Sequence, residues 1–600
     1  MNLPERFFPP PWTAAVVLLC ASACINVPGI ESAETEVRMT SPAETAYTNG
    51  ALELRLAVTG HAPDRVELLK NGEVLAELAP PYVYTWDTTG EAEGTYRLEA
   101  RAVLGDTAFV SPSRDVVVDR TPPQVVSRFP EPGAQEVWVQ SPIRAEFSEP
   151  MKRSTVTTES VHLRVGELAV AHTVSLSEDG RTVTVTPVTA LTAPSTVELS
   201  VTGVLTDLAG NAAVDLGAAW GWVVPEFVPY PSFQPNSEAA PSGITPRIRL
   251  DANGHPTVLT LQHHDSGPNL FVTRWTGSRW QQLGGGLKTS STDYSVRSPD
   301  IQLSPDGTPI VAWQEDLGAE FNNYIHVARW TGATWERLGG SEGILPERPH
   351  AWGVSLQIDA NGNPVVAIDM DPEDVDGNAV HVYQWSTGQW QRIGAALHGA
   401  PQYRVRTPAL AMDLNGHPVV AFAQDDNNAG RILVWRWTGM TWEQLGTAAN
   451  TSPHIKSIYR IHISITSSNQ PVISWSGRVP TTYKDDIFYS QWTSSQWVPL
   501  GAPQHQDSTN DRAAHETYSA PGDKLLALSS EHTSSGTQIS LDCRTNEQWN
   551  NIWSTRNLPS GTMHRGISSS MAADTHGNIA LAWPANRDGH WDVVVYRRNQ

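Results

Sequence analysis

One short phrase that carries two tryptophans returns along this chain with little change. It reads RWTGSRWQQLGG from Arg274 and RWTGATWERLGG from Arg329. Its first tryptophan recurs roughly every 55 residues, at Trp275, Trp330, Trp385, Trp437 and Trp492. Self-similarity at such a period predicts stacked copies of one small unit rather than a single continuous core.

A second marker keeps the same period and shows what one copy contains. It is a turn, such as LDANGHPTV or MDLNGHPVV, placed ahead of the tryptophan phrase. Its turn residues are Gly254, Gly307, Gly362, Gly416, Asn469, Gly522 and Gly577. The first copy offers four short strands, PRIRLD, PTVLTLQ, NLFVTRW and WQQLGG. Seven copies of four antiparallel strands predict a seven-bladed β-propeller over residues 226–600.

The spacing also predicts how the ring closes. The chain ends just after WDVVVYRR, the third strand of the last copy, so one outer strand is missing there. In complete copies the fourth-strand tryptophan precedes the next first-strand apolar residue by about 21 positions, as Trp280 precedes Ile301. Counting back by the same interval from Ile248 gives Phe227. We therefore predict that residues 227–230 supply the outer strand of the last blade.

The repeated tryptophans and arginines have a structural and a functional interpretation. Trp275 and Trp280 flank a tight turn, where cross-strand aromatic pairs stabilise a hairpin, and we expect them to be packing residues. A sugar-stacking platform is the alternative. Arg274, Arg329 and Arg436 recur at one equivalent position beside the tryptophan. That position favours a structural role with outer-strand exposure over convergence at an axial catalytic site.

Two smaller β-domains precede the repeats. With 45 Gly, 44 Pro and only 17% charged residues, the composition favours strands joined by many turns. Residues 39–119 alternate apolar and polar positions, and Asn71-Gly72 between two such runs predicts a hairpin. We expect a β-sandwich there, with Trp86 and Tyr96 in its core.

Both domains resemble known modules. PPYVYTWDTTGEAEGTYRLEARA in the first is similar to bacterial Ig-like modules. Residues 120–225 contain RTPPQVV, FSEPM and DLAGN, and they closely resemble a second bacterial Ig-like family found in surface-layer proteins. This resemblance implies a second sandwich that acts as a spacer. We interpret Asp207 and Asn211 of DLAGN as turn residues that bond their own backbone, rather than as metal ligands.

The N-terminus is typical of a targeting segment rather than of a fold. Arg6 precedes the apolar run WTAAVVLLCASA, which is too short to span a bilayer as a stable helix. LLCASAC resembles a lipobox, with Ala21 where Leu is usual, and implies a signal peptide over 1–23 and a lipid anchor on Cys24. Simple secretion and an uncleaved anchor are the alternatives. With residues 24–38 as a tether, we expect a protein of the cell envelope, anchored to the outer membrane or facing the cell exterior.

The charge and the variable loops limit the partners. A net charge of -22 without a basic run argues against nucleic acid and anionic membrane surfaces. Propellers usually bind where their variable loops gather. Those loops carry the candidate ligand-face residues His263, His264, Asp265, Asp316, Asp371, Asp374, Asp376, Asp425, Asp426 and Asp485. Such an acidic rim could hold Ca²⁺. The EF-hand spacing fails, however, so a solvated rim is favoured and no cofactor is predicted.

No motif assigns a catalytic residue. The sequence has no G-x-S-x-G elbow and no H-E-x-x-H helix, and Cys543 lies on a degenerate strand as a buried structural thiol. We expect a monomeric, non-enzymatic surface lipoprotein whose Ig-like spacers present a propeller for protein or glycan binding. The alternative is an extracellular carbohydrate-active enzyme, a hydrolase or lyase, with acids such as Asp316, Asp371 and Asp425 at the channel mouth. A hydrolase would need two carboxyl groups about 5–9.5 Å apart.

Overall fold

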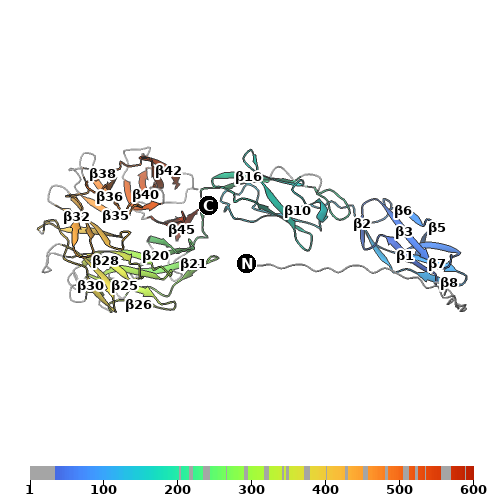
Figure 1. The fold of residues 1–600 in the computed structure, drawn as a ribbon, viewed down its shortest axis with the longest axis horizontal. Helices are drawn as coiled ribbons and strands as arrows, with labels where there is room; N and C mark the ends of the chain where they lie inside the picture. Colours follow the sequence, from blue (N-terminus) through green and yellow to red (C-terminus); the bar gives the residue numbers. More distant parts are fainter. Residues whose placement is uncertain are drawn as a thin grey trace, which may run out of the picture. The chain divides into compact units, whose positions relative to one another are not determined.

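Strands make up almost every regular element of the chain (Figure 1). The computed structural model describes residues 34–201, 205–214, 220–233, 243–264, 267–288, 295–316, 323–340, 343–345, 351–370, 379–400, 402–425, 430–450, 457–479, 484–503, 512–520, 524–533, 536–555, 569–587 and 590–600. The one helix that lies wholly within these ranges is the short 3-10 turn η1 (Arg153–Thr155), and no helix there is long and apolar enough to cross a membrane.

The chain divides into two compact units. The first takes in the described residues up to Pro132, together with Pro142–Thr189 and Glu198–Trp220. The second consists of Gly133–Ser141, Ala190–Val197 and the described residues from Gly221 to Gln600.

The first domain of the N-terminal unit has a sheet of order β1-β3-β6 and a sheet of order β2-β9-β7-β4-β5, with β8 paired to β7. Its strands are β1 (Glu36–Ser41), β2 (Ala46–Thr48), β3 (Ala51–Thr59), β4 (Arg65–Lys70), β5 (Glu73–Leu78), β6 (Val83–Asp87), β7 (Gly94–Leu104), β8 (Thr107–Val110) and β9 (Arg114–Val118). The predicted hairpin is confirmed, because Asn71 and Gly72 both have positive φ, 51° and 89°, as a type I′ turn requires. Trp86 is 2% exposed, and Tyr96 packs edge-on against it at 5.4 Å between ring centroids.

The second domain has sheets of order β10-β11-β15-β14 and β13-β12-β16-β17. Its strands are β10 (Val125–Phe129), β11 (Ile143–Phe147), β12 (Val161–Val165), β13 (Leu168–Ala169), β14 (His172–Leu176), β15 (Thr182–Pro187), β16 (Ser195–Val201) and β17 (Trp220–Val224). The turn interpretation of DLAGN is confirmed for Asp207 and wrong for Asn211, whose side-chain amide donates to the Asp119 carbonyl at 3.0 Å and to the Asp207 carboxylate at 2.8 Å. One carboxylate oxygen of Asp207 accepts the backbone N–H groups of Gly210 at 2.7 Å and Asn211 at 2.8 Å.

The C-terminal unit holds seven four-stranded sheets among its described residues. Six follow chain order: β19 (Gly243–Leu250), β20 (Pro256–His264), β21 (Gly267–Trp275) and β22 (Trp280–Gln282); β23 (Val296–Leu303), β24 (Pro309–Asp316), β25 (Asn323–Trp330) and β26 (Trp335–Arg337); β27 (Ala351–Ile358), β28 (Pro364–Met370), β29 (Ala379–Ser386) and β30 (Gln389–Arg392); β31 (Val405–Met412), β32 (Pro418–Asp425), β33 (Gly430–Trp437) and β34 (Trp442–Gln444); β35 (Ile458–Ile465), β36 (Pro471–Val479), β37 (Lys484–Trp492) and β38 (Trp497–Pro499); β39 (Arg512–Ala520), β40 (Lys524–Thr533), β41 (Gly536–Thr545) and β42 (Gln548–Ser554).

The remaining sheet joins the two ends of this unit. Its order is β18-β45-β44-β43, with β18 (Phe227–Pro229), β43 (Ser570–Ala573), β44 (Ile579–Arg587) and β45 (His590–Arg598). Phe227 lies opposite Arg598 in an antiparallel pairing, and the Tyr230 N–H donates to the Val595 carbonyl at 2.8 Å. The predicted outer strand is therefore confirmed.

The first strands of the seven sheets contact one another in a closed cycle. β19 contacts β23, and the contacts continue through β27, β31, β35, β39 and β43, which in turn contacts β19. Each sheet thus packs between two neighbours in a propeller-like arrangement. The second strands are covered on both faces as a result, and Trp313, Ile368 and Phe422 at their centres are all 0% exposed.

Each tryptophan pair joins its own sheet to the preceding one. Trp330 and Trp335 lie opposite each other on β25 and β26, with ring centroids 5.3 Å apart. The Trp335 indole N–H donates to the carbonyl of Leu283, after β22, at 2.7 Å. Gly284 has φ +70°, and a Cβ there would lie 3.1 Å from both rings. The repeated Leu-Gly is therefore the surface on which the next copy's tryptophans pack.

The same bond recurs around the unit. Trp390 donates to Leu338 at 2.9 Å, Trp442 to Ile393 at 2.8 Å and Trp497 to Leu445 at 2.7 Å. The packing interpretation of the tryptophans is thereby confirmed.

The neighbouring arginines are also structural, although their expected exposure is wrong. Arg436 donates to the Asn469 carbonyl in the turn of the next sheet at 2.8 Å, and Arg274 bonds Gly307 in the same way. These side chains are half-buried because they reach between sheets.

Candidate functional site: a charged axial cavity

The first strands of the seven sheets enclose a cavity of about 870 Å³. All seven contribute lining residues, including Arg247 on β19, Asp300 on β23, His462 on β35 and Glu516 on β39. A volume of this size lies within the usual range of ligand pockets.

In four of the sheets, one equivalent position on the first strand links that sheet to the next. There a side-chain oxygen accepts a backbone N–H of the next first strand. Asp300 accepts from Leu356 at 2.9 Å, and Ser355 accepts from Leu410 at 3.1 Å. Glu516 accepts from Met571 at 2.7 Å, and Ser570 accepts from Ile248 at 3.0 Å. These bonds tie neighbouring sheets together around the axis.

The other three sheets depart from this pattern. They carry Arg247, Ala409 and His462 at the equivalent positions. An arginine side chain has no acceptor and an alanine has no polar atom, so neither residue can make the bond. Arg247 and His462 both line the cavity instead.

A bulge on β35 adds a second arginine to the cavity wall. The pairing of β35 with β36 shifts between Tyr459 and His462, and Arg460 within the shift has φ 47°. Ser298 and Thr407, at matching bulges on β23 and β31, have φ 50° and 51° and also line the cavity. Such bulges redirect side chains, and here the redirected side chain in the fifth sheet is a guanidinium.

Two carboxylates accompany a third arginine. Arg249 approaches Asp300 at 3.3 Å and Glu516 at 3.9 Å. Glu516 also accepts from the Ser570 hydroxyl at 2.8 Å. Burial nevertheless raises the pKa of Glu516, and the charges of Arg249 and Arg247 oppose that rise.

The basic residues of the cavity affect one another's titration. Burial first, and then the charge of Arg247, lower the pKa of Arg460. Burial lowers the pKa of His462 to about 3, assisted by Arg247, Arg460 and Arg249, so the imidazole is neutral at physiological pH. The cavity therefore concentrates positive charge within a strongly acidic chain.

The predicted ligand-face residues that are described lie at strand ends. His263 is exposed at the end of β20, and Asp316 ends β24. Asp425 is ion-paired with Arg406, and Asp485 with Arg478 at 3.0 Å. The remaining candidates lie outside the described residues or, for His264, have no described side chain: His264, Asp265, Asp371, Asp374, Asp376 and Asp426. The acidic rim and its Ca²⁺ remain predictions.

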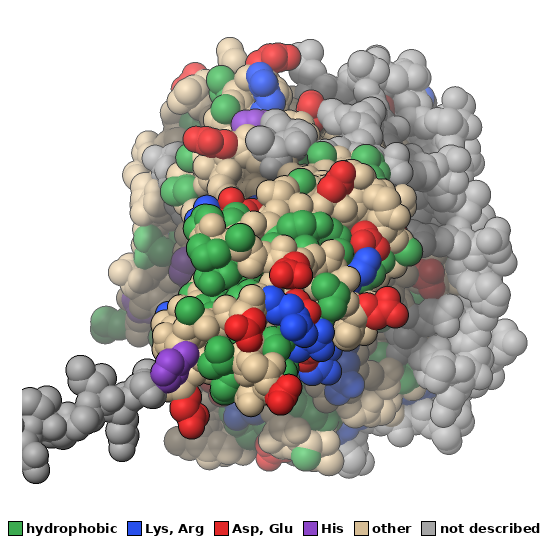
Figure 2. Space-filling view, turned by 90° about the vertical axis from the view of Figure 1, so that its right-hand side faces the viewer, with side chains coloured by type: hydrophobic (Ala, Val, Ile, Leu, Met, Phe, Trp, Pro, Cys, Tyr) green, Lys and Arg blue, Asp and Glu red, His purple; other side chains and the backbone are tan. Residues whose placement is uncertain are grey.

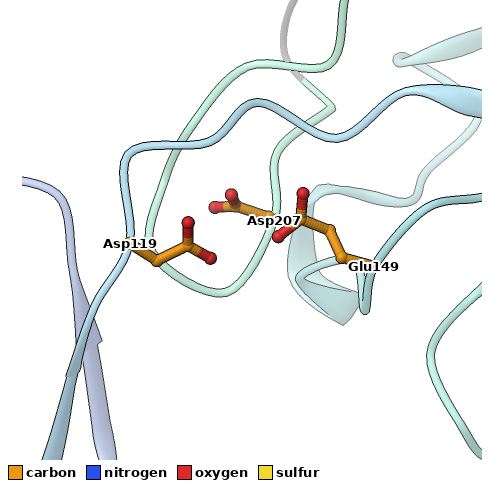
Figure 3. A group of neighbouring side chains, drawn as sticks. All are labelled: Asp119, Glu149 and Asp207. Atoms are coloured by element: carbon orange, nitrogen blue, oxygen red, sulfur yellow. The ribbon is translucent and has the colours of Figure 1, made fainter. Parts of the chain in front are cut away.

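Three carboxylates meet in the N-terminal unit (Figure 3). Asp119, Glu149 and Asp207 each bring one oxygen to within 4.8 Å of the others, and Figure 3 shows their carboxyl groups pointing toward one another. Burial and the charge of Asp119 raise the pKa of Glu149 to about 7. Within the described residues this is the group whose oxygens suit a hard cation best. At acidic pH a proton on Glu149, in place of a cation, reduces the repulsion between the three carboxyl groups.

Several charged side chains of the first domain are paired with one another. Arg65 and Arg101 both bond Glu67, at 2.9 and 2.6 Å, and these bonds lower the pKa of the Glu67 carboxyl. Figure 2, seen from the right-hand side of Figure 1 where β5, β7 and β8 are labelled, shows Lys and Arg side chains gathered among acidic ones.

The prediction that Cys543 is a buried thiol is confirmed. It is 8% exposed on β41, and burial raises its pKa, which disfavours the reactive thiolate.

Sequence reasoning did not find the cavity residues. A partial signal was present, because six of these residues stand one position before an apolar residue of a first strand: Arg247, Asp300, Ser355, Ala409, His462 and Ser570. Glu516 precedes Thr517 instead. Aligning the copies on that position would have shown that its chemistry changes from copy to copy. The bulge at Arg460 has no comparable signal, since no glycine marks its positive φ.

Two family models match the N-terminal part of the chain. Residues 36–100 match a model described as bacterial Ig domain, and residues 119–222 match one described as bacterial Ig-like domain. No curated protein matches the chain.

Several solved structures resemble the chain at low identity. An ulvan lyase is 10% identical, with a TM-score of 0.43 over 61% of this chain and 95% of that one. A second polysaccharide lyase is 9% identical, with a TM-score of 0.41 over 62% and 93%. An α-L-arabinanase from Penicillium chrysogenum is 12% identical, with a TM-score of 0.33 over 50% and 92%. Because these scores lie below 0.5, no activity follows from them.

Proposed function

We propose that residues 226–600 form a seven-bladed β-propeller, carried on two Ig-like modules, which binds a ligand in its axial cavity without chemical turnover. The observation that carries the proposal is the cavity of about 870 Å³ into which all seven first strands project side chains. A pocket that combines apolar walls with a few converging polar groups is the usual form of a ligand site.

The polar groups of the cavity favour binding over catalysis. Asp300 and Glu516 are the acids that line it, and both lie against Arg249. Both also accept backbone N–H groups from neighbouring strands. Carboxylates engaged in this way hold the sheets and the guanidinium in place.

A carbohydrate-active enzyme is the second candidate, and one observation favours it. Glu516 lines the cavity with a raised pKa, as a general acid needs, and Asp300 contacts the same guanidinium. Under this alternative Glu516→Gln abolishes turnover of a bound polysaccharide. Under the binding proposal there is no turnover to lose.

A binding screen separates these functions. The full-length chain is immobilised and presented with polysaccharides and extracellular proteins, and both retention and product release are measured. Ser464→Tyr then places a bulky side chain in the cavity, where Tyr518 on β39 shows that these strands accept a tyrosine. We expect retention without product release and loss of retention in Ser464→Tyr. Retention unchanged by this substitution contradicts binding in the cavity.

We also propose that the protein is displayed at the cell surface through a lipid on Cys24. The match of residues 36–100 and 119–222 to bacterial Ig-like models supports an extracytoplasmic location. Cells grown with a labelled fatty acid should incorporate the label into this chain, and Cys24→Ala should abolish incorporation and release the protein from membranes. A chain that never incorporates the label would exclude the anchor.

A further inference from the structure

We propose that the axial cavity binds an oxyanion, the carboxylate, sulfate or phosphate group of a ligand, between Arg247, Arg460 and His462. This inference rests on the ligand-binding function proposed above and names the chemistry of the group that is bound.

The first observation is the loss of a structural bond. In four of the seven sheets the equivalent position carries an oxygen that ties the next sheet, for example Asp300 to Leu356 at 2.9 Å and Ser570 to Ile248 at 3.0 Å. Arg247 and His462 occupy this position without supplying such an acceptor oxygen. Sequences depart from a local rule of their own fold mostly at functional sites.

The second observation is the backbone at Arg460. Its φ of 47° lies in the left-handed region, which residues with a side chain rarely adopt. Ser298 and Thr407 show that the bulge itself belongs to the repeat and accepts small side chains. Placing an arginine in this conformation gives the cavity wall a guanidinium that no other bulge supplies.

The third observation is the balance of charge. Three arginines line the cavity, and the acids Asp300 and Glu516 both approach the same one, Arg249. With His462 neutral, the described lining carries more cations than anions, although the whole chain has a net charge of -22.

An oxyanion fits these three side chains. Planar guanidinium groups bind carboxylate and phosphate through paired N–H donors, and a neutral imidazole adds one further N–H. The first strands carrying Arg247 and Arg460 belong to the first and fifth sheets of the ring, so a bound group would be held from different sides.

The test is isothermal titration calorimetry on the full-length chain at low salt. The probes are glucuronate, inorganic sulfate and inorganic phosphate, with glucose as the neutral control. We expect at least one anion to bind and glucose to bind at least ten-fold more weakly. We also expect the affinity for the anion to fall as salt is raised. The ranking of the three anions identifies which oxyanion the cavity prefers.

Two variants tie binding to the cavity. Arg460→Asn keeps a residue that tolerates positive φ, and Arg247→Ser introduces the side chain found at the equivalent Ser355 and Ser570. Both should keep the melting temperature of the parent while weakening anion binding by ten-fold or more. Arg279→Gln, in an exposed turn outside the cavity, should bind as the parent does.

The results separate this inference from the proposed function. Absence of anion binding, or anion binding unaffected by both variants, overturns the oxyanion site. In that case the chain could still retain a neutral polysaccharide, and Ser464→Tyr could abolish that retention. Such a result would support the proposed binding in the cavity without an oxyanion site. Loss of anion binding in both variants at unchanged melting temperature supports both.

Discussion

Gly394 shows how a single residue without a side chain permits contact between two sheets. It has φ +66°, and a Cβ there would lie 2.6 Å from the Trp437 ring and 2.7 Å from the Trp442 ring of the next copy. Gly388, in the preceding hairpin turn, has φ +83° with nothing within 4 Å of its Cβ position. The two glycines share a backbone requirement and differ in the space around them.

The first prediction compares alanine at these two positions. Gly388→Ala should lower the free energy of unfolding by about 1 kcal/mol through backbone strain alone. Gly394→Ala should lower it by about 2–4 kcal/mol, because overpacking against two fixed rings is added. Urea unfolding of both variants measures the difference. Equal losses would mean that the tryptophans do not pack on Gly394.

Glu149 provides a prediction for pH. Its pKa is raised from 4.5 to about 7 in the folded state, so between these values the folded chain holds a proton that the unfolded chain releases. Its contribution to the free energy of unfolding therefore decreases as pH rises from about 4.5 to about 7.

Glu149→Gln removes this contribution, because the amide that replaces the carboxyl group does not titrate. Differential scanning calorimetry of the full chain should show a gain in melting temperature for the variant over the parent that is larger at pH 7 than at pH 5. A difference that is the same at both pH values would show that Glu149 does not titrate abnormally.

At the scale of elements, the repeated phrase describes one interaction between neighbouring sheets. The Trp442 indole N–H donates to the Ile393 carbonyl of the preceding sheet at 2.8 Å. Trp437 lies opposite it at 5.3 Å between centroids and packs on the same glycine. In the described part of the chain, no carbonyl accepts the indole N–H of Trp437.

This pair gives a third prediction. Trp437→Phe and Trp442→Phe remove similar apolar area, but only the second leaves a carbonyl without its donor. Trp442→Phe should therefore be less stable than Trp437→Phe by about 1 kcal/mol in chemical denaturation. Equal stability would indicate that the indole bond contributes nothing and that ring packing alone joins the sheets.

The sequence made these elements predictable where a physical requirement is the same in every copy. Tryptophans, the Leu-Gly pair and the Asp-x-x-Gly turns recur because each sheet must contact the next in one way. The cavity position was not predictable in this manner. Arg247 and His462 stand where other copies have Ser355 or Asp300, so the residue type at this position does not repeat from copy to copy. Arg460 depends on a bulge that only the pairing of β35 with β36 reveals.

For the whole C-terminal unit, the decisive feature is that a segment before the first repeat completes the last sheet. Simple arithmetic on the repeat spacing located Phe227, and β18 pairs with β45 as that spacing required. Glu226 strengthens the junction through a 2.7 Å ion pair with Arg598. The ligand could not be predicted from spacing, because it depends on side chains that vary between copies.

The most direct test of this closed ring is a disulfide across the junction. Val228 lies opposite Arg597 in the β18–β45 pairing, where Cα atoms are about 4.5–5.5 Å apart and within reach of a disulfide. Cys543, the native cysteine among the described residues, is buried and therefore does not compete for the introduced thiols. The measurement is the mobility of the denatured full chain carrying Val228→Cys and Arg597→Cys, before and after reduction.

We expect mild oxidation to give a faster-migrating monomer that reverts on reduction, because the loop from residue 228 to residue 597 stays closed. Val228→Cys with Met440→Cys, whose native side chain is 85% exposed on a distant turn, should give no such species. If the first pair leaves both thiols free while the chain is folded, residues 228 and 597 are not neighbours. The repeats would then form an open stack without an axial cavity.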